Sequence, residues 1–190
     1  MTKRYKAADV FPLPRFKTER EQGGLVAAVG RPAPLVRYQE NTRESGIYAA
    51  ELEVRRIMRN PTKLAPNGQL GLYPVELLWT TAEQVQGYLD IVLSWPWDRW
   101  RTGPAWPMKA EWDDWPTPHY ESGIIHLPRT APWCLRELVV LHEVAHHFTQ
   151  GQIHGPAWVQ AFLDLLGTCM APTVAQLLRN EFTKHGVVST

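Results

Sequence analysis

The sequence predicts an α+β fold in which a small mixed or antiparallel sheet packs on a buried helix, with further helices around it. Residues 131–148 are helix-length and apolar on most of the helix circumference, the pattern of a helix buried on all sides. Residues 120–127 are β-like and precede this helix by one short loop. Two helix-length segments that each begin with a proline, 156–166 and 172–185, follow it.

The first 38 residues differ in composition from the rest of the chain. They contain four prolines and three glycines without a sustained period, and eight Lys or Arg residues against three acidic ones. We expect residues 1–38 to form an extended basic arm and residues 39–190 to form a single domain. Such an arm could bind nucleic acid, although a solvated tail is the more frequent meaning of a charge run.

Three segments between the arm and residue 94 have recognisable patterns. Residues 40–60 have the apolar spacing of an amphipathic helix that ends at the following proline. Residues 72–79 have strand character, and Thr81 with Gln84 forms a capping box that begins the next helix. The predicted apolar positions of the first helix are Tyr48, Ala49, Leu52, Val54, Ile57 and Met58.

Tryptophan is concentrated in one segment of the chain. Six of the nine tryptophans lie between residues 95 and 115, interrupted by prolines. These rings could form the aromatic wall of a substrate cleft. They could also cover a sheet whose strands are too short to make a deep core, and we favour this second interpretation.

The residue run 142–154 contains four of the seven histidines. His142 and His146 are four residues apart, so their rings project from the same face of a helix, and Glu143 can reach over the same metal ion. In this HExxH pattern two neutral imidazoles bind Zn²⁺ and the carboxylate takes a proton from the bound water. A metal also resolves the cost of burying these polar side chains in an apolar helix.

A hydrolytic zinc site needs a third protein ligand and one open position for water. His154 is our candidate, because Gly151 permits the chain to turn back after the helix and Pro156 can begin the next helix. Asp164 and Glu181 are the carboxylate alternatives.

Other side chains near the motif are candidates for contacting substrate or for orienting a ligand. His147 follows His146 directly and points about 100° away on the helix. Together with Tyr120 and His126, it is a candidate for stabilising a negatively charged intermediate. His119 and His126 could also help to bind metal, although strand histidines are more often substrate contacts or exposed. Trp158 is a further candidate for contacting substrate or for orienting a ligand.

Composition limits the expected partners and location. The net charge is +1, so no overall field favours nucleic acid or an anionic membrane. The N-terminus lacks the apolar region of a signal peptide, and no stretch approaches 18 apolar residues. The two cysteines lack the spacing of a metal or disulfide framework. We therefore expect a cytoplasmic protein that does not insert into membranes.

The order of strand, HExxH helix, histidine-containing turn and following helix resembles the zincin-like metallopeptidases. The segment from His154 to Trp158 resembles the His-Gly-x-x-aromatic element of SprT-like proteases. The strand followed by the HExxH helix is similar to both SprT-like and ImmA/IrrE-type peptidases. The whole chain resembles an uncharacterised family of metallohydrolases from actinobacteria and their phages.

These resemblances imply a zincin-like fold, one Zn²⁺ bound by His142, His146 and His154, Glu143 as general base, and a peptide or protein substrate. In zinc peptidases an edge strand beside the site helix pairs with an extended substrate, and we expect residues 120–127 to be that strand. No DNA-binding module or helix-turn-helix is recognisable. The alternatives are a structural or virion-associated binding protein stabilised by zinc, and a nucleic-acid-associated protein that uses the basic arm.

Overall fold

The structure, a computed structural model, describes residues 35–59, 74–100, 107–150 and 153–188. In these ranges it contains five α-helices and a three-stranded mixed sheet, which confirms an α+β fold. The predicted arm lies outside the described residues as far as residue 34. The elements are α1 (Leu35–Arg59), α2 (Ala82–Ser94), β1 (Lys109–Asp113), β2 (His119–Glu121), β3 (Ile124–Pro128), α3 (Glu137–Phe148), α4 (Pro156–Cys169) and α5 (Pro172–Lys184).

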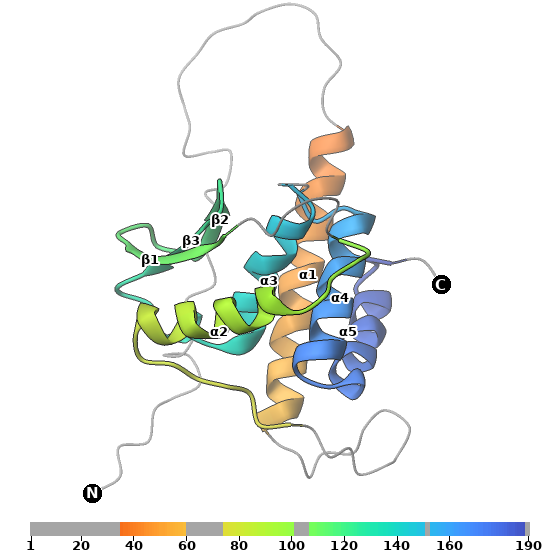
Figure 1. Cartoon of the computed structure of the whole chain (residues 1–190). Helices are drawn as coiled ribbons and strands as arrows, with labels where there is room; N and C mark the ends of the chain where they lie inside the picture. The colour runs from red at the N-terminus through yellow and green to blue at the C-terminus, as the bar shows by residue number, and fades with distance from the viewer. Residues whose placement is uncertain (1–34, 60–73, 101–106, 151–152, 189–190) are drawn as a thin grey trace, which may run out of the picture.

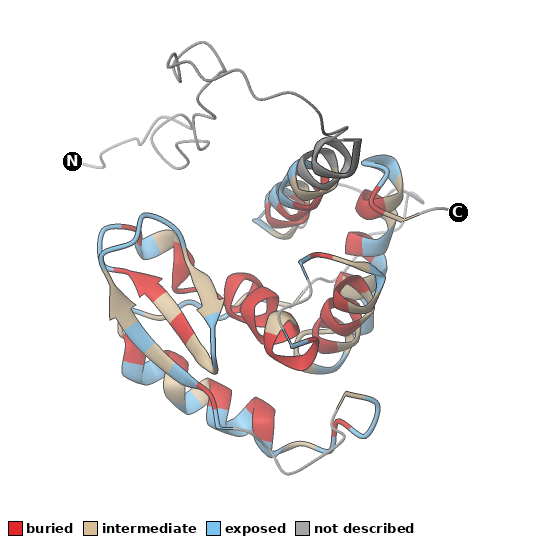
Figure 2. Cartoon of the chain, turned by 90° about the horizontal axis from the view of Figure 1, so that it is seen from above, coloured by how far each residue is buried: buried red, intermediate tan, exposed pale blue. Residues whose placement is uncertain are grey.

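Helix α3 lies at the centre of the molecule, with the sheet and α2 on one side and α1, α4 and α5 on the other (Figure 1). Every residue of α3 except His146 is buried. Figure 2 shows this concentration of buried residues on α3 and on the helices beside it. The expected buried helix is therefore present, and it is the element on which the other layers pack.

The start of the buried helix differs from the prediction. The helix was expected from residue 131, but Pro132 begins a separate 3₁₀ helix that ends at Cys134. Arg136 is then extended, with φ −144° and ψ 151°, and α3 begins at Glu137. The extended conformation of Arg136 allows backbone pairing with Leu78 of the preceding segment, which a continuous helix would prevent.

Residues 74–79 form a cap on α3 rather than the predicted strand, since their pairing is a single antiparallel bridge. The carboxylate of Glu76 accepts hydrogen bonds from Arg136 Nε at 2.9 Å and from the backbone N–H of Leu138 at 3.2 Å. A second guanidinium nitrogen of Arg136 also contacts Glu76. Glu76 thus places negative charge where the unpaired N–H groups of a helix begin.

The sheet has the strand order β1-β3-β2, with β1 parallel and β2 antiparallel to the central β3. Ile125 and Leu127 of β3 are fully buried, so the intervening His126 lies on the opposite face. The prediction of a single strand over residues 120–127 is wrong. Ser122 and Gly123 both have positive φ, 48° and 89°, and form a two-residue hairpin turn that separates β2 from β3.

Helix α1 is amphipathic as predicted, but its buried face is rotated by about one residue. Tyr48 and Leu52 were expected inside and are 48% and 42% exposed. The buried positions are Ile47, Ala50, Glu51, Val54, Arg55 and Ile57. This rotation turns the Glu51 carboxylate toward α3, where it has a hydrogen-bonding partner.

The remaining helix signals act as expected. The Thr81 hydroxyl caps α2 by accepting a hydrogen bond from the Gln84 N–H at 3.3 Å. The Gln84 side chain returns to the N–H of Thr80, not Thr81, at 2.9 Å. At the end of α5, Gly186 has φ 69°, the left-handed conformation that glycine adopts most easily.

Most described rings of the tryptophan-rich segment pack against the core, but Trp97 and Trp100 contact α3 and α4, whereas the favoured interpretation named the sheet. Trp97 is 6% exposed and packs on Phe148 at the end of α3, with ring centroids 5.4 Å apart. Trp95, Trp100 and Trp112 are partly buried against the same core, and Trp115 is exposed. None of the described helices is long and apolar enough to cross a membrane.

Replacing Glu76 by alanine should destabilise the fold by about 3 kcal/mol, because it leaves the buried Arg136 guanidinium unpaired and removes an acceptor at the start of α3. Urea unfolding followed by circular dichroism measures this change. Glu121→Ala, at an exposed carboxylate, is the control and should change stability by less than about 0.5 kcal/mol. Equal effects of the two substitutions would contradict the capping role of Glu76.

Candidate metal centre

Two histidines of α3 and a third from the turn before α4 lie close together. His142 and His146 lie one turn apart on α3, and His154 lies just before α4. One ring nitrogen of each lies within 4.8 Å of the others. The ring centroids are 4.9 to 5.2 Å apart, and each pair of rings is inclined by 57° to 74°. Rings splayed in this way can direct three lone pairs to one point, as a metal ion requires.

One of the three nitrogen pairs has a spacing close to that of two ligands of a tetrahedral ion. His142 Nε2 and His154 Nε2 are 3.1 Å apart. Two imidazole nitrogens bound to one zinc at 2.0–2.1 Å lie about 3.3 Å apart when the geometry is tetrahedral. The site can therefore accept Zn²⁺ with only a small outward shift of these rings.

Three features describe the state in which the structure holds His154. Its Nδ1 is buried without a hydrogen-bond partner among the described residues. Burial, followed by the neighbouring His142 and His146, lowers the pKa of His154 to about 2, so the ring is neutral and keeps a lone pair. Its φ of 43° is a left-handed conformation that is rare outside glycine and costs about 1 kcal/mol or more. The fold holds a strained, neutral ligand in place.

Glu51 of α1 orients His142. Its Oε1 lies 2.6 Å from His142 Nδ1, and both side chains are almost fully buried. A ring that donates Nδ1–H to a carboxylate keeps its lone pair on Nε2, the atom that faces His154. Burial lowers the pKa of His142, but the Glu51 carboxylate outweighs it and the net direction is upward. A metal ion must therefore compete with a proton at this ring.

Glu143 is buried next to the histidines. Burial raises the pKa of its carboxyl to about 7, against the opposing effect of His142. The Glu51 carboxylate raises this pKa further, whereas the backbone N–H of Tyr120 hydrogen-bonds Glu143 and lowers it. A carboxyl group with this pKa exchanges its proton near neutral pH, which is the property of a general base.

Two aromatic side chains surround the triad. Trp158, in the first turn of α4, is fully buried, and its ring centroid lies 4.5 to 5.4 Å from those of the three histidines. Tyr48 of α1 stacks on His142 at 5.9 Å and meets His154 edge-on at 6.0 Å. Trp158 closes the inner side of the site, and the half-exposed Tyr48 lies at its solvent side.

Tyr120 and His147 form a separate pair beside Glu143. The Tyr120 hydroxyl accepts a hydrogen bond from the Gly123 N–H at 3.0 Å and lies 3.0 Å from His147 Nδ1. His147 thus faces β2 and not the triad. The pair joins the edge strand to α3 at the residue that follows His146.

The remaining candidate residues lie elsewhere. His126 faces Asp113 of β1 and His119 of β2. Asp164 binds the indole N–H of Trp100 at 3.1 Å, and Glu181 pairs with Lys184 in α5. Within the described part of the chain, the structure groups His154, and neither of the carboxylate alternatives, with His142 and His146.

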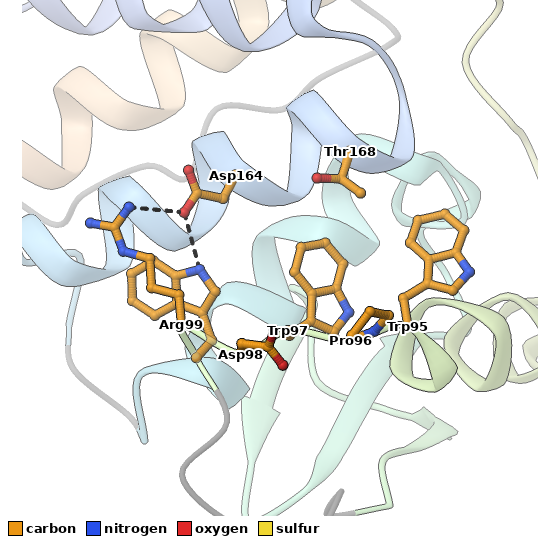
Figure 3. A pocket seen from close by; sticks show the side chains of 8 residues that line it. Trp95, Pro96, Trp97, Asp98, Arg99, Asp164 and Thr168 are labelled. Carbon is orange, nitrogen blue, oxygen red and sulfur yellow. Dashed lines mark hydrogen bonds and ion pairs between the residues drawn. The ribbon is translucent and has the colours of Figure 1, made fainter.

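The tryptophan-rich segment lines a hollow that is distinct from the triad. Its volume is about 430 Å³, and it lies between residues 95–100 and α4. Figure 3 shows the Asp164 carboxylate directed toward Arg99 and Trp100, with Trp95, Trp97 and Thr168 further along the hollow. None of the three histidines lines it, so the rings form no wall of the metal centre here.

Sequence reasoning missed Glu51 and Tyr48 as parts of the site. A signal for Glu51 was present, since it lies four residues after Ile47 and three before Val54 and thus interrupts an apolar helix face. A carboxylate in that position requires a buried partner. Tyr48 offered no comparable signal, because an aromatic residue on an amphipathic helix is ordinarily part of the core.

Replacing Glu51 by glutamine should weaken zinc binding about 10- to 100-fold, because the amide holds His142 less firmly in the ligand tautomer. Competition with a chromophoric chelator measures the affinity. The matched control is Glu53→Gln, two residues along α1, where the exposed carboxylate pairs with Arg56. Unchanged affinity in Glu51→Gln, with native circular dichroism, would show that Glu51 does not orient the ligand.

Comparison with known proteins gave no family assignment. A scan against protein-family models found no matching model. A search of curated proteins and a search of solved structures likewise found no match. The function of the chain is therefore inferred from the geometry of the metal centre.

Proposed function

We propose that this protein is a zinc-dependent metallohydrolase that cleaves peptide bonds. One observation carries the proposal: ligand nitrogens of three histidines lie within 4.8 Å of one another, and Glu143, which directly follows the first of them, is a buried carboxyl group whose pKa is raised to about 7. A structural metal site needs the three histidines, but it does not need a buried carboxyl group beside the first of them. The combination of the two is typical of hydrolytic zinc sites.

Each residue has a defined role in this proposal. His142, His146 and His154 hold the ion, and Glu51 keeps Nε2 of His142 available to it. Bound Zn²⁺ supplies a Lewis acid and lowers the pKa of a coordinated water to about 7. Glu143 accepts a proton on its carboxylate and passes it to the leaving amine. Burial favours the protonated form of Glu143, and a bound cation would oppose this effect.

The edge strand supports an extended peptide as the substrate. In the portion of the chain that the structure describes, no strand pairs with the outer edge of β2. An extended peptide can add to such an edge through backbone hydrogen bonds. The Tyr120 hydroxyl contacts His147, four residues after Glu143 on α3, so a peptide along β2 would pass beside the helix that carries the proposed general base. Tyr120 and His147 are our candidates for stabilising the developing negative charge.

The second candidate function is that of a structural protein whose fold is stabilised by zinc. The burial of His142 and His154, which are 4% and 6% exposed, favours it because structural zinc sites are closed to solvent. In that case Glu143 would be an idle buried carboxyl group. The two candidates differ in whether the zinc-loaded protein turns over a substrate.

The test is Glu143→Gln on the zinc-loaded protein, assayed with a degenerate library of internally quenched peptides and with casein. We expect the variant to keep its zinc and to lose about 10²- to 10⁴-fold in rate, because the amide cannot accept a proton. Zinc content is measured by mass spectrometry of metals. His146→Ala should lose both the metal at this centre and the activity.

Glu83→Gln is the control for removing a carboxylate, since Glu83 is exposed in the first turn of α2. It should retain both zinc and rate. A wild-type protein that holds zinc at the triad but cleaves neither substrate would support the structural candidate. Wild-type activity that persists undiminished in Glu143→Gln would remove Glu143 from the mechanism.

A further inference from the structure

A second group of metal-binding side chains lies on the sheet. Asp113 of β1, His119 of β2 and His126 of β3 each have one ligand atom within 4.8 Å of the others. His119 and His126 are directly opposite each other in the antiparallel pair. Glu111, which shares a face with Asp113, is opposite His126 in the parallel pair. All three strands thus direct a metal-binding side chain to the face opposite the buried Ile125 and Leu127.

The three side chains are partly oriented for binding. Asp113 Oδ1 accepts hydrogen bonds from the backbone N–H groups of Asp114 at 2.5 Å and Trp115 at 3.1 Å. Its Oδ2 remains directed at His126, 3.0 Å from Nδ1. His119 Nδ1 lies 3.4 Å from the Thr117 carbonyl, a contact that favours a proton on Nδ1 and a lone pair on Nε2.

We propose that Asp113, His119 and His126 form a second binding site for a divalent transition-metal ion such as Zn²⁺. Two ligands of one zinc ion lie about 3.3 Å apart, close to the separation between Asp113 Oδ2 and His126 Nδ1. The ion would take the place of the hydrogen on His126 Nδ1, and the neutral ring would then carry its single N–H on Nε2. Two imidazoles with one carboxylate select zinc, nickel or copper over calcium and magnesium, which prefer oxygen ligands.

One ring must turn for the ion to bind. His119 and His126 are stacked, with centroids 4.5 Å apart and an angle of 8° between the rings. Parallel rings do not direct both lone pairs to one point. Rotation about the bond to the ring is soft, and His119 is only partly buried, so the cost of this turn is small. The site should therefore bind zinc more weakly than the buried triad, where the rings are already splayed.

Nearby charges favour a cation. Glu111, Asp114 and Glu121 are exposed around the three ligands. Arg129 lies 3.8 Å from Asp114, and Lys109 is also exposed on β1. The acidic groups outnumber the basic ones on this part of the sheet, and the position beyond three protein ligands is open to water or to Glu111. This site does not depend on the proposed hydrolase activity.

The test is titration of metal-free full-length protein with ZnCl₂ by isothermal calorimetry. We expect two equivalents in the wild type, one tight and one weaker. Asp113→Asn and His119→Ala should each lose the weaker equivalent and keep the tight one. Asparagine retains the oxygen that accepts from the Asp114 and Trp115 N–H groups, so the strand end should remain folded, which circular dichroism checks.

Two matched controls separate the site from general surface binding. Asp114→Asn removes the neighbouring carboxylate, which is 96% exposed, and His185→Ala removes an exposed histidine outside both clusters. Both should keep two equivalents. A wild type with a single equivalent would overturn the proposal. So would a weaker equivalent that survives in Asp113→Asn and His119→Ala, or one that the two controls lose as well.

A second measurement tests whether the bound ion joins the three strands. Hydrogen–deuterium exchange over residues 107–128 should slow when the weaker equivalent binds in the wild type, because the ion joins β1, β2 and β3. The same addition of zinc to Asp113→Asn should leave exchange in this segment unchanged. Equal slowing in both proteins would place the second ion elsewhere.

Discussion

The hydrogen bond between Glu51 and His142 constrains which face of α1 turns toward α3. It joins α1 to α3 across 91 residues of sequence, and both side chains are buried. In an apolar interior neither group can be left unpaired without a large cost in free energy, so α1 must turn Glu51 inward. That requirement explains why Tyr48 and Leu52 lie on the exposed side of an otherwise apolar helix.

Much of the metal centre could be predicted from local sequence, because its chemistry is local. His142, Glu143 and His146 lie within five residues on one helix, and the helical period alone places them together. His154 could be proposed because a turn of a few residues returns the chain to the same helix. Glu51 could not be paired with His142 in the same way, since no local periodicity relates α1 to α3. The sequence indicated only that Glu51, on an apolar helix face, needs some buried partner.

The errors in the predicted element boundaries also come from partners that lie far away in the sequence. The sequence around Pro132 permits a helix, and the choice of an extended Arg136 comes from its pairing with Glu76, sixty residues away. Similarly, residues 120–127 alternate well enough for one strand, and their local turn signal is only a Ser-Gly pair. Pairing with the parallel strand β1 stabilises the hairpin. It places β3 in the centre of the sheet, where Ile125 and Leu127 are buried. Tertiary partners decided both boundaries.

The short strand β2 connects the two histidine clusters. Consecutive side chains of a strand point to opposite faces, so His119 lies with Asp113 and His126 on one face, while the Tyr120 side chain contacts His147 of α3 on the other. A slip of one residue in the pairing of β2 with β3 would exchange these two faces. With only three residues, β2 has few backbone hydrogen bonds to prevent such a slip. An ion held by Asp113, His119 and His126 would fix this register from the outer face of the sheet, and it would thereby keep the Tyr120 hydroxyl in contact with His147 on the inner face.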